Sequence, residues 1–189
     1  MTRSFDGSEV DTEWLEERCA EALWAPTAGN SAGVRMHVIA QRDVASYFHC
    51  ATDEHWRNNA RRAAGLMRAG AVVLVTAQPD LYLKRYAEPD KSESKLARLE
   101  SWPLPYWHTD AAMATMALLL LLEEARLCAT IWGSFRHEQD VLRWARVDDE
   151  QLFVSVLIGR DDGNDVASSS LQRDVPPRRA RVSRVNPTN

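Results

Sequence analysis

The sequence lacks the motifs that mark several large classes of enzyme. It has no GxGxxG, GxxxxGK[ST], HExxH or GxSxG element, so Rossmann, P-loop, zinc-protease and serine-hydrolase interpretations have no support. Its three cysteines, Cys19, Cys50 and Cys128, include no CxxC pair and no Cys/His spacing of the zinc type, and no metal site is predicted. Widely spaced, odd-numbered cysteines are typical of reduced thiols, and we predict a cytoplasmic protein.

An excess of positive charge and a long hydrophobic run are also missing. The formal net charge is −4 at pH 7, which argues against nucleic acid or an anionic membrane as a partner. The N-terminal residues MTRSFDGSEVDTEW contain no apolar stretch of the signal-peptide type, so export is not indicated. The longest apolar run, Met113 to Leu122, is too short to span a bilayer and predicts a buried helix.

A chain of 189 residues with 45% apolar content is sufficient for one domain with a sizeable core. Strands and helices alternate without a regular βαβ rhythm, which predicts an α/β (α+β) fold with a mixed sheet flanked by helices. Strands are expected at 35–40, 71–77 and 152–159, with 71–77 in a central position, and 128–133 is expected to form a short strand or an extended turn. Helices are expected at 12–23, capped by Thr12 or Asp11, at 110–126, capped by Thr109 or Asp110, and at 135–145, with one or two more between 43 and 68. Residues 81–105 are expected to form an irregular surface excursion, and an extended basic tail, 161–189, is expected to follow the domain at 1–160.

The residues before the first predicted strand combine an arginine, a helix and a permissive turn. Arg3 precedes Phe5 by two residues, and APTAGN at 25–30 joins the helix to the strand. This segment resembles the opening of the FMN-dependent nitroreductase family, in which an Arg-x-Phe element precedes a helix and a Pro-Ser-x-x-Asn turn. The resemblance implies cofactor contacts in two groups: Arg3 and Ser4, then Pro26, Thr27 and Asn30. From the residues alone, an arginine at position 3 is more often a frayed surface residue, and Gly29 and Asn30 equally end the helix in left-handed geometry.

A second segment carries the same likeness. ATIWGSF at 129–135 aligns without a gap with the family's Ala-Thr-Pro-Ile-Glu-Gly-Phe, whose backbone lies against the reactive edge of the flavin. The resemblance therefore implies cofactor contacts at Ile131, Trp132, Gly133 and Ser134. Taken without it, a tryptophan after a strand is more often part of the core.

The middle of the chain narrows the resemblance to an actinobacterial group of nitroreductase-like proteins. That group shares the Tyr-Ala-Glu-Pro-Asp-Lys element at 86–91 and the Pro-Tyr-Trp element at 105–107. Tyr106 and Trp107 are implied as aromatic residues of the substrate pocket. The alternative interpretation is an aromatic plug on the core.

The groups expected to hold the cofactor phosphate are few. Arg173 is retained from the family's basic C-terminal clamp, whereas Gln172 and Val175 stand where cations are frequent. The family's Arg-Arg-Ser element, which would precede Met1, is absent, and Ala32, Gly33 and Val34 replace the usual Gln-Pro-Trp. The sequence thus predicts weak flavin binding, and upstream residues of the Arg-Arg-Ser type would tighten it roughly tenfold.

The function implied by the resemblance is that of a flavin-dependent oxidoreductase. NAD(P)H or a similar donor would reduce FMN, and a nitroaromatic, quinone or other conjugated small molecule would accept the electrons. The family resemblance also implies a homodimer with flavins between the subunits. Two alternatives stay open: a cofactor-poor relative that sequesters or senses flavin, and an enzyme that uses the deazaflavin F420.

Overall fold

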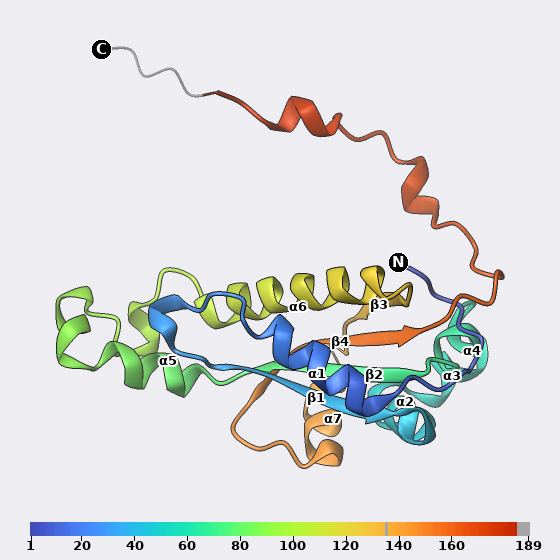
Figure 1. Ribbon diagram of the computed structural model, residues 1–189, viewed down its shortest axis with the longest axis horizontal. Coiled ribbons are helices and arrows are strands. Elements are labelled where there is room, and N and C mark those ends of the chain that lie inside the picture. The colour runs from blue at the N-terminus through green and yellow to red at the C-terminus, as the bar shows by residue number, and fades with distance from the viewer. Residues whose placement is uncertain (135, 185–189) are drawn as a thin grey trace.

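The computed structural model describes residues 1–134 and 136–184, and its centre is a four-stranded sheet (Figure 1). The strands are β1 (Val34–Ala40), β2 (Ala71–Ala77), β3 (Cys128–Trp132) and β4 (Gln151–Gly159), in the order β1-β2-β4-β3. Their pairings are antiparallel. The predicted fold class and the central position of β2, which is buried along its whole length, are confirmed.

Helices cover both faces of the sheet. The long helix α6 (Tyr106–Glu124) packs with α1 (Thr12–Ala22) against one face. The other face carries α2 (Val44–Ala51) and α7 (Glu138–Ala145). Because side chains alternate along a strand, Val73 and Val75 of β2 face the first layer, and Val72 and Leu74 face the second.

Local signals fix several helix ends. The Asp11 carboxylate caps α1 by accepting hydrogen bonds from the amides of Glu13 and Trp14, as the sequence predicts. The region 43–68 holds three short helices rather than one or two, namely α2, α3 (Glu54–Asn59) and α4 (Ala63–Leu66). Asp53 starts α3 by accepting from the Trp56 amide at 2.7 Å. Phe135, the predicted start of the α7 segment, lies outside the described residues.

The prediction of an irregular excursion at 81–105 is wrong for its first part, because residues 81–86 belong to helix α5 (Pro79–Tyr86). Proline at the first helical position is compatible with a helix start, because its missing N–H has no intrahelical partner there. Two short turns follow, at Pro89–Ser94 and Leu99–Ser101. Helix α6 begins at Tyr106, directly after Pro105 and four residues before the predicted start, so Asp110 is not its cap.

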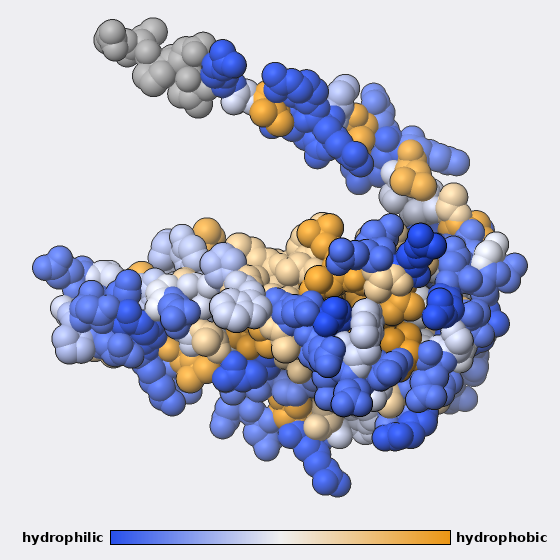
Figure 2. All heavy atoms as spheres, viewed as in Figure 1, coloured by the Kyte–Doolittle hydropathy of each residue, from blue (hydrophilic) through white to orange (hydrophobic). Residues whose placement is uncertain are grey.

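Helix α6 is buried on one face only, which corrects the prediction of a fully buried helix. Leu118 and Leu122 are inaccessible, whereas Met113, Met116 and Leu120 are 42%, 52% and 59% exposed. Apolar residues are visible along the α6 region of the surface in Figure 2. None of the helices in the described part of the chain has the length and apolarity needed to cross a membrane.

The chain leaves the body beside α4 and continues as an arm that stands apart from it (Figure 1). Every residue from Ser169 to Arg184 is exposed, including the apolar Leu171, Val175 and Val182. As far as Arg184, the arm is extended apart from two short turns, Ser169–Gln172 and Arg178–Arg181.

Candidate functional site

A cationic cavity of about 380 Å³ lies where the N-terminal segment, the α3–α4 region, β3 and the first residues of the arm meet. Three arginines line it, and none of its described lining residues is acidic. We call it the arginine cavity, and its principal residues are Arg3, Arg61, Arg62, Thr130, Ile131 and Trp132. The structure therefore brings together Arg3 and the β3 residues that the sequence predicts.

Arg61 and Arg62 are members of this site that sequence reasoning missed. Arg62 donates to the carbonyl oxygen of Val166 at 2.7 Å, which directs its side chain toward the start of the arm. Its Nε is buried and has no hydrogen-bond partner among the described residues. A guanidinium that lines a cavity with no acidic residue in its described lining is suited to an anionic ligand. The only sequence signal was the Arg-Arg pair itself, within a polar, helix-forming region.

A smaller cavity of about 210 Å³ adjoins the first, and Trp56 and Trp132 line both. The two indole rings are 4.9 Å apart between centroids. Gly133 and Ser134 line the smaller cavity, and Ser134 is close to the Tyr47 hydroxyl at 3.4 Å. The predicted segment from Ile131 to Ser134 thus follows the walls of two neighbouring cavities.

Ser4 has a partner within the chain. Its hydroxyl donates to Asp162 at 2.9 Å, and Asp162 also pairs with Arg68. Hydrogen bonds from the Asn164 amide and from Ser4 hold the pKa of Asp162 below its usual value. A Cβ on Gly65 would lie 2.7 Å from the Ser4 hydroxyl, so this close packing requires glycine. Ser4 therefore anchors the N-terminus, and the Arg3 side chain beside it reaches the arginine cavity.

The predicted cofactor turn is a separate element between α1 and β1. Gly29 and Asn30 both have positive φ, 63° and 56°, as the left-handed interpretation expects, but α1 already ends at Ala22. The Thr27 hydroxyl accepts a hydrogen bond from the Ala32 amide at 3.0 Å. Asn30 is exposed, and its side chain is accessible to a ligand. Pro26 is also exposed.

This turn and the arginine cavity belong to opposite edges of the sheet. The turn leads into β1, the cavity is built on β3, and two strands lie between them. At a spacing of about 4.8 Å per strand, the two edges are roughly 14 Å apart. In Figure 1 the turn lies beside α5 at one end of the molecule, and the N-terminus and α4 lie at the other. One chain does not bring Thr27 and Asn30 together with Arg3 and Ile131.

The remaining predicted residues lie elsewhere. Trp107 is 5% exposed and packs with Tyr82 and Trp102 in an aromatic cluster, the arrangement expected of a core plug. Tyr106 is 39% exposed and lies 5.7 Å from the Trp102 ring. Arg173 is exposed on the arm, beyond the Ala167–Ser169 stretch that lines the arginine cavity.

Asp110 is a buried carboxylate that ties the turn to helix α6. Its Oδ2 accepts hydrogen bonds from the Ala28 amide and from the Tyr82 hydroxyl, both at 2.8 Å. Burial, reinforced by the hydrogen bond to Asp110, raises the pKa of Tyr82. The sequence contained a signal for this role, since an aspartate ahead of a long apolar helical run is expensive to bury unless it is paired.

Comparison with known proteins agrees with this architecture. The model of the nitroreductase family matches residues 1–160. The chain belongs to the nitroreductase family. No curated protein sequence matches it significantly.

Solved structures share the fold of this nitroreductase family member at low sequence identity. The nitroreductase family protein from Streptococcus pneumoniae is 17% identical, with a TM-score of 0.67 over 97% of this chain and 94% of that one. CinD from Lactococcus lactis, solved with chloramphenicol, is 14% identical, with a TM-score of 0.68 over 94% and 95%. A Desulfovibrio desulfuricans protein solved with FMN is 16% identical, with a TM-score of 0.61 over 98% and 92%.

Proposed function

We propose that this protein is an FMN-dependent oxidoreductase that binds its cofactor in the arginine cavity. The observation that carries the proposal is the convergence of Arg3, Arg61 and Arg62 on a cavity with no acidic lining residue among those described. The Arg62 guanidinium, which lines this cavity, supplies a positive charge and hydrogen-bond donors for an anion. Family membership and the FMN complex of a protein with the same fold support this choice of ligand.

Each part of the cavity would hold one part of FMN. Arg61 and Arg62 would hold the phosphate, and Arg3 would lie near the pyrimidine and ribityl portion. The strand from Ile131 to Ser134 would lie along the reactive edge of the ring. Bound FMN would supply the redox chemistry, so the protein has to bind, orient and shield it rather than provide an acid and base pair.

NAD(P)H is the proposed hydride donor, and a nitroaromatic, quinone or other conjugated small molecule is the proposed acceptor. Steady-state oxidation of NAD(P)H with such acceptors tests turnover. The second candidate is a relative that sequesters or senses flavin, and it is favoured by the distance of Arg173 from the cavity along an exposed arm. This candidate would be supported if the protein binds FMN stoichiometrically but shows no turnover with either NAD(P)H or reduced F420 as the donor.

We also propose a homodimer in which residues 1–160 form the flavin-binding domain and the tail at 161–189 reaches a second copy. Three observations support it: the two parts of the predicted site occupy opposite sheet edges, α6 exposes Met113, Met116 and Leu120, and the arm exposes further apolar residues. An apolar helix face of this kind is typical of a subunit interface. In the dimer, the turn of one subunit would complete the cavity of the other.

The dimer is tested by charge insertion on the exposed face of α6. Met116→Glu is expected to yield monomers at micromolar concentration, because a carboxylate would be buried without a partner at the interface. Gln139→Glu, on α7 across the sheet, introduces the same charge and should leave the dimer intact. Light scattering measures both variants beside the wild type. A monomeric wild type would contradict the proposal.

The turn is tested by removing the Asn30 amide while retaining its backbone conformation. Asn30→Gly preserves the positive φ, and loss of one ligand hydrogen bond should weaken FMN binding by roughly twofold to tenfold. Thr27→Ala should weaken it by a similar factor. Asp149→Gly, at another exposed position with positive φ of 59°, is the matched control and should bind FMN like the wild type. Equal affinity in all four proteins would remove the turn from the site.

A further inference from the structure

We propose that Arg85 is a positioning residue that fixes the conformation of the turn at 25–31 by linking it to the Glu88–Asp90 segment. The effect of this residue on cofactor binding rests on the proposed function. The claim about the turn itself rests on the geometry alone.

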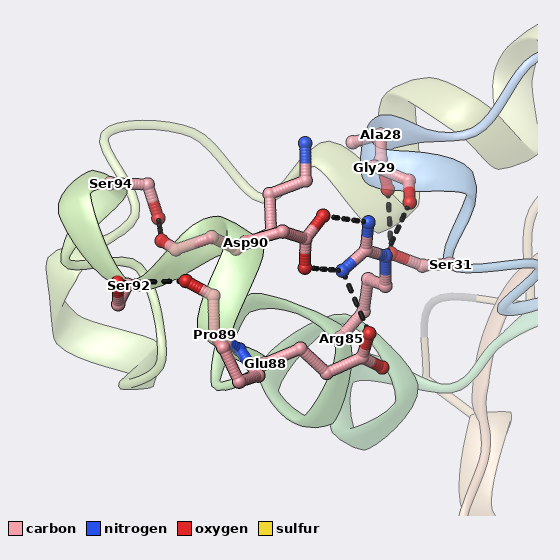
Figure 3. Close-up of polar contacts among 10 residues, drawn as sticks. Ala28, Gly29, Ser31, Arg85, Glu88, Pro89, Asp90, Ser92 and Ser94 are labelled. Atoms are coloured by element: carbon pink, nitrogen blue, oxygen red, sulfur yellow. Dashed lines mark hydrogen bonds and ion pairs between the residues drawn. The ribbon is translucent and has the colours of Figure 1, made fainter.

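The Arg85 guanidinium uses all of its nitrogen atoms in this link (Figure 3). Its Nε donates to the carbonyl oxygen of Gly29 at 2.9 Å. Its two terminal nitrogens donate to the two carboxylate oxygens of Asp90, both at 2.7 Å, and one of them also donates to Glu88 at 2.9 Å. A planar fork with donors on both sides makes this arrangement possible, and a lysine ammonium cannot reproduce it.

Close packing reinforces the link. A Cβ on Gly29 would lie 2.8 Å from the Tyr86 ring, and a Cβ on Gly33 would lie 2.4 Å from the Tyr82 ring. Both tyrosines belong to α5, one helical turn apart, so this helix packs directly on the backbone of the turn. This explains why Gly33 stands where the family's Gln-Pro-Trp element has proline: any larger residue would displace Tyr82.

A second charged side chain holds the turn from another direction. The Ala28 amide donates to Asp110 of α6, whereas the Gly29 carbonyl accepts from Arg85 of α5. Two consecutive residues of an outlying turn thus have their backbone polar groups bound by charged side chains from two helices. The φ and ψ angles before Asn30 are thereby constrained, and so is the direction of the Asn30 side chain.

The Tyr-Ala-Glu-Pro-Asp-Lys element at 86–91 therefore has a structural role, which is to hold the Arg85 side chain. Pro89 follows Glu88 and opens a short helical turn that presents Asp90 to Arg85. The Arg85 hydrogen bonds and charge in turn hold the pKa of Asp90 below its usual value. The segment after α5 orders the arginine, and the arginine orders the turn.

The test compares Arg85→Lys with Arg98→Lys. Both variants keep the positive charge, but Arg98 pairs with Glu100 in the segment before α6, and within the described part of the chain it makes no hydrogen bond or ion pair with the turn. Hydrogen exchange at the Asn30 and Ser31 amides, which bond to Thr27 and Ala28, reports the turn without any cofactor. FMN affinity and the melting temperature are measured on the same samples.

Arg85→Lys is expected to accelerate exchange at these two amides by about tenfold and to weaken FMN binding by about fivefold to twentyfold. Arg98→Lys should change neither, and Asp90→Asn should reproduce the direction of both effects if Arg85→Lys does not fold. Unchanged exchange in Arg85→Lys would overturn the proposal. Faster exchange with unchanged FMN affinity would support the link between Arg85 and the turn and would contradict its effect on cofactor binding. If the wild type binds no FMN, the proposed function fails, and the exchange measurement still decides whether Arg85 orders the turn.

Discussion

Replacing Arg62 with alanine is expected to lower the affinity for FMN by roughly 10-fold to 100-fold. The loss corresponds to one charge-assisted hydrogen bond, about 1.5 to 3 kcal/mol, removed from a partly enclosed site. Arg62 is chosen because its guanidinium is fixed by the Val166 carbonyl, so its position does not depend on the ligand. Fluorescence quenching during FMN titration measures the change, and Arg61→Ala should act in the same direction.

Two controls identify the group that Arg62 binds. Arg42→Ala removes the same charge from an exposed position outside the cavity and should leave FMN affinity unchanged. Riboflavin lacks the phosphate, so its affinity should be nearly equal in wild type and Arg62→Ala. An equal loss for FMN and riboflavin would place Arg62 at the ring edge and contradict its assignment to the phosphate.

Asp110→Ala is expected to reduce the free energy of unfolding by about 2 to 4 kcal/mol. The substitution leaves the Ala28 amide and the buried Tyr82 hydroxyl without an acceptor. An unsatisfied buried donor costs about 1 to 3 kcal/mol, and the half-buried Ala28 amide belongs at the low end of this range. Urea denaturation followed by tryptophan fluorescence measures the loss. The effect exceeds that of an ordinary surface substitution on the same helix.

The neighbouring Thr109 provides the comparison. Thr109→Ala removes an exposed hydroxyl that bonds to the Tyr106 carbonyl, and it should change stability by about 0.5 kcal/mol or less. Tyr82→Phe should be destabilising by less than Asp110→Ala, because Asp110 keeps its bond to Ala28. If Asp110→Ala unfolds at the same urea concentration as Thr109→Ala, Asp110 does not tie the turn to α6.

The strands were the part of the fold that the sequence specified best. The β-branched run of β2 predicts a strand buried on both faces, and the flanking strands follow from their own apolar patterns. The Asp11 cap and the acidic residues that follow it likewise predict α1 closely. These signals are local, since they depend on residues only a few positions apart.

The contacts that build the site were harder to predict because they join distant segments. From the sequence alone, Asp110 is predicted to cap a helix, because nothing near it in the chain indicates its partners Ala28 and Tyr82. Arg61 and Arg62 look like a solvent-exposed pair in the sequence, which does not show that the arm lies beside them. The prediction of weak flavin binding from the sequence did not count Arg61 and Arg62 among the cofactor residues. The arginine cavity places both beside Arg3, so tight binding is expected.

The most direct test of the central claim is titration of the 189-residue protein with FMN, combined with its visible absorption spectrum as purified. We predict saturable binding of one FMN per chain with a dissociation constant of about 1 μM or tighter, and the two visible bands of a bound flavin. Absence of saturable FMN binding, or a single visible band of the deazaflavin type, would contradict the account.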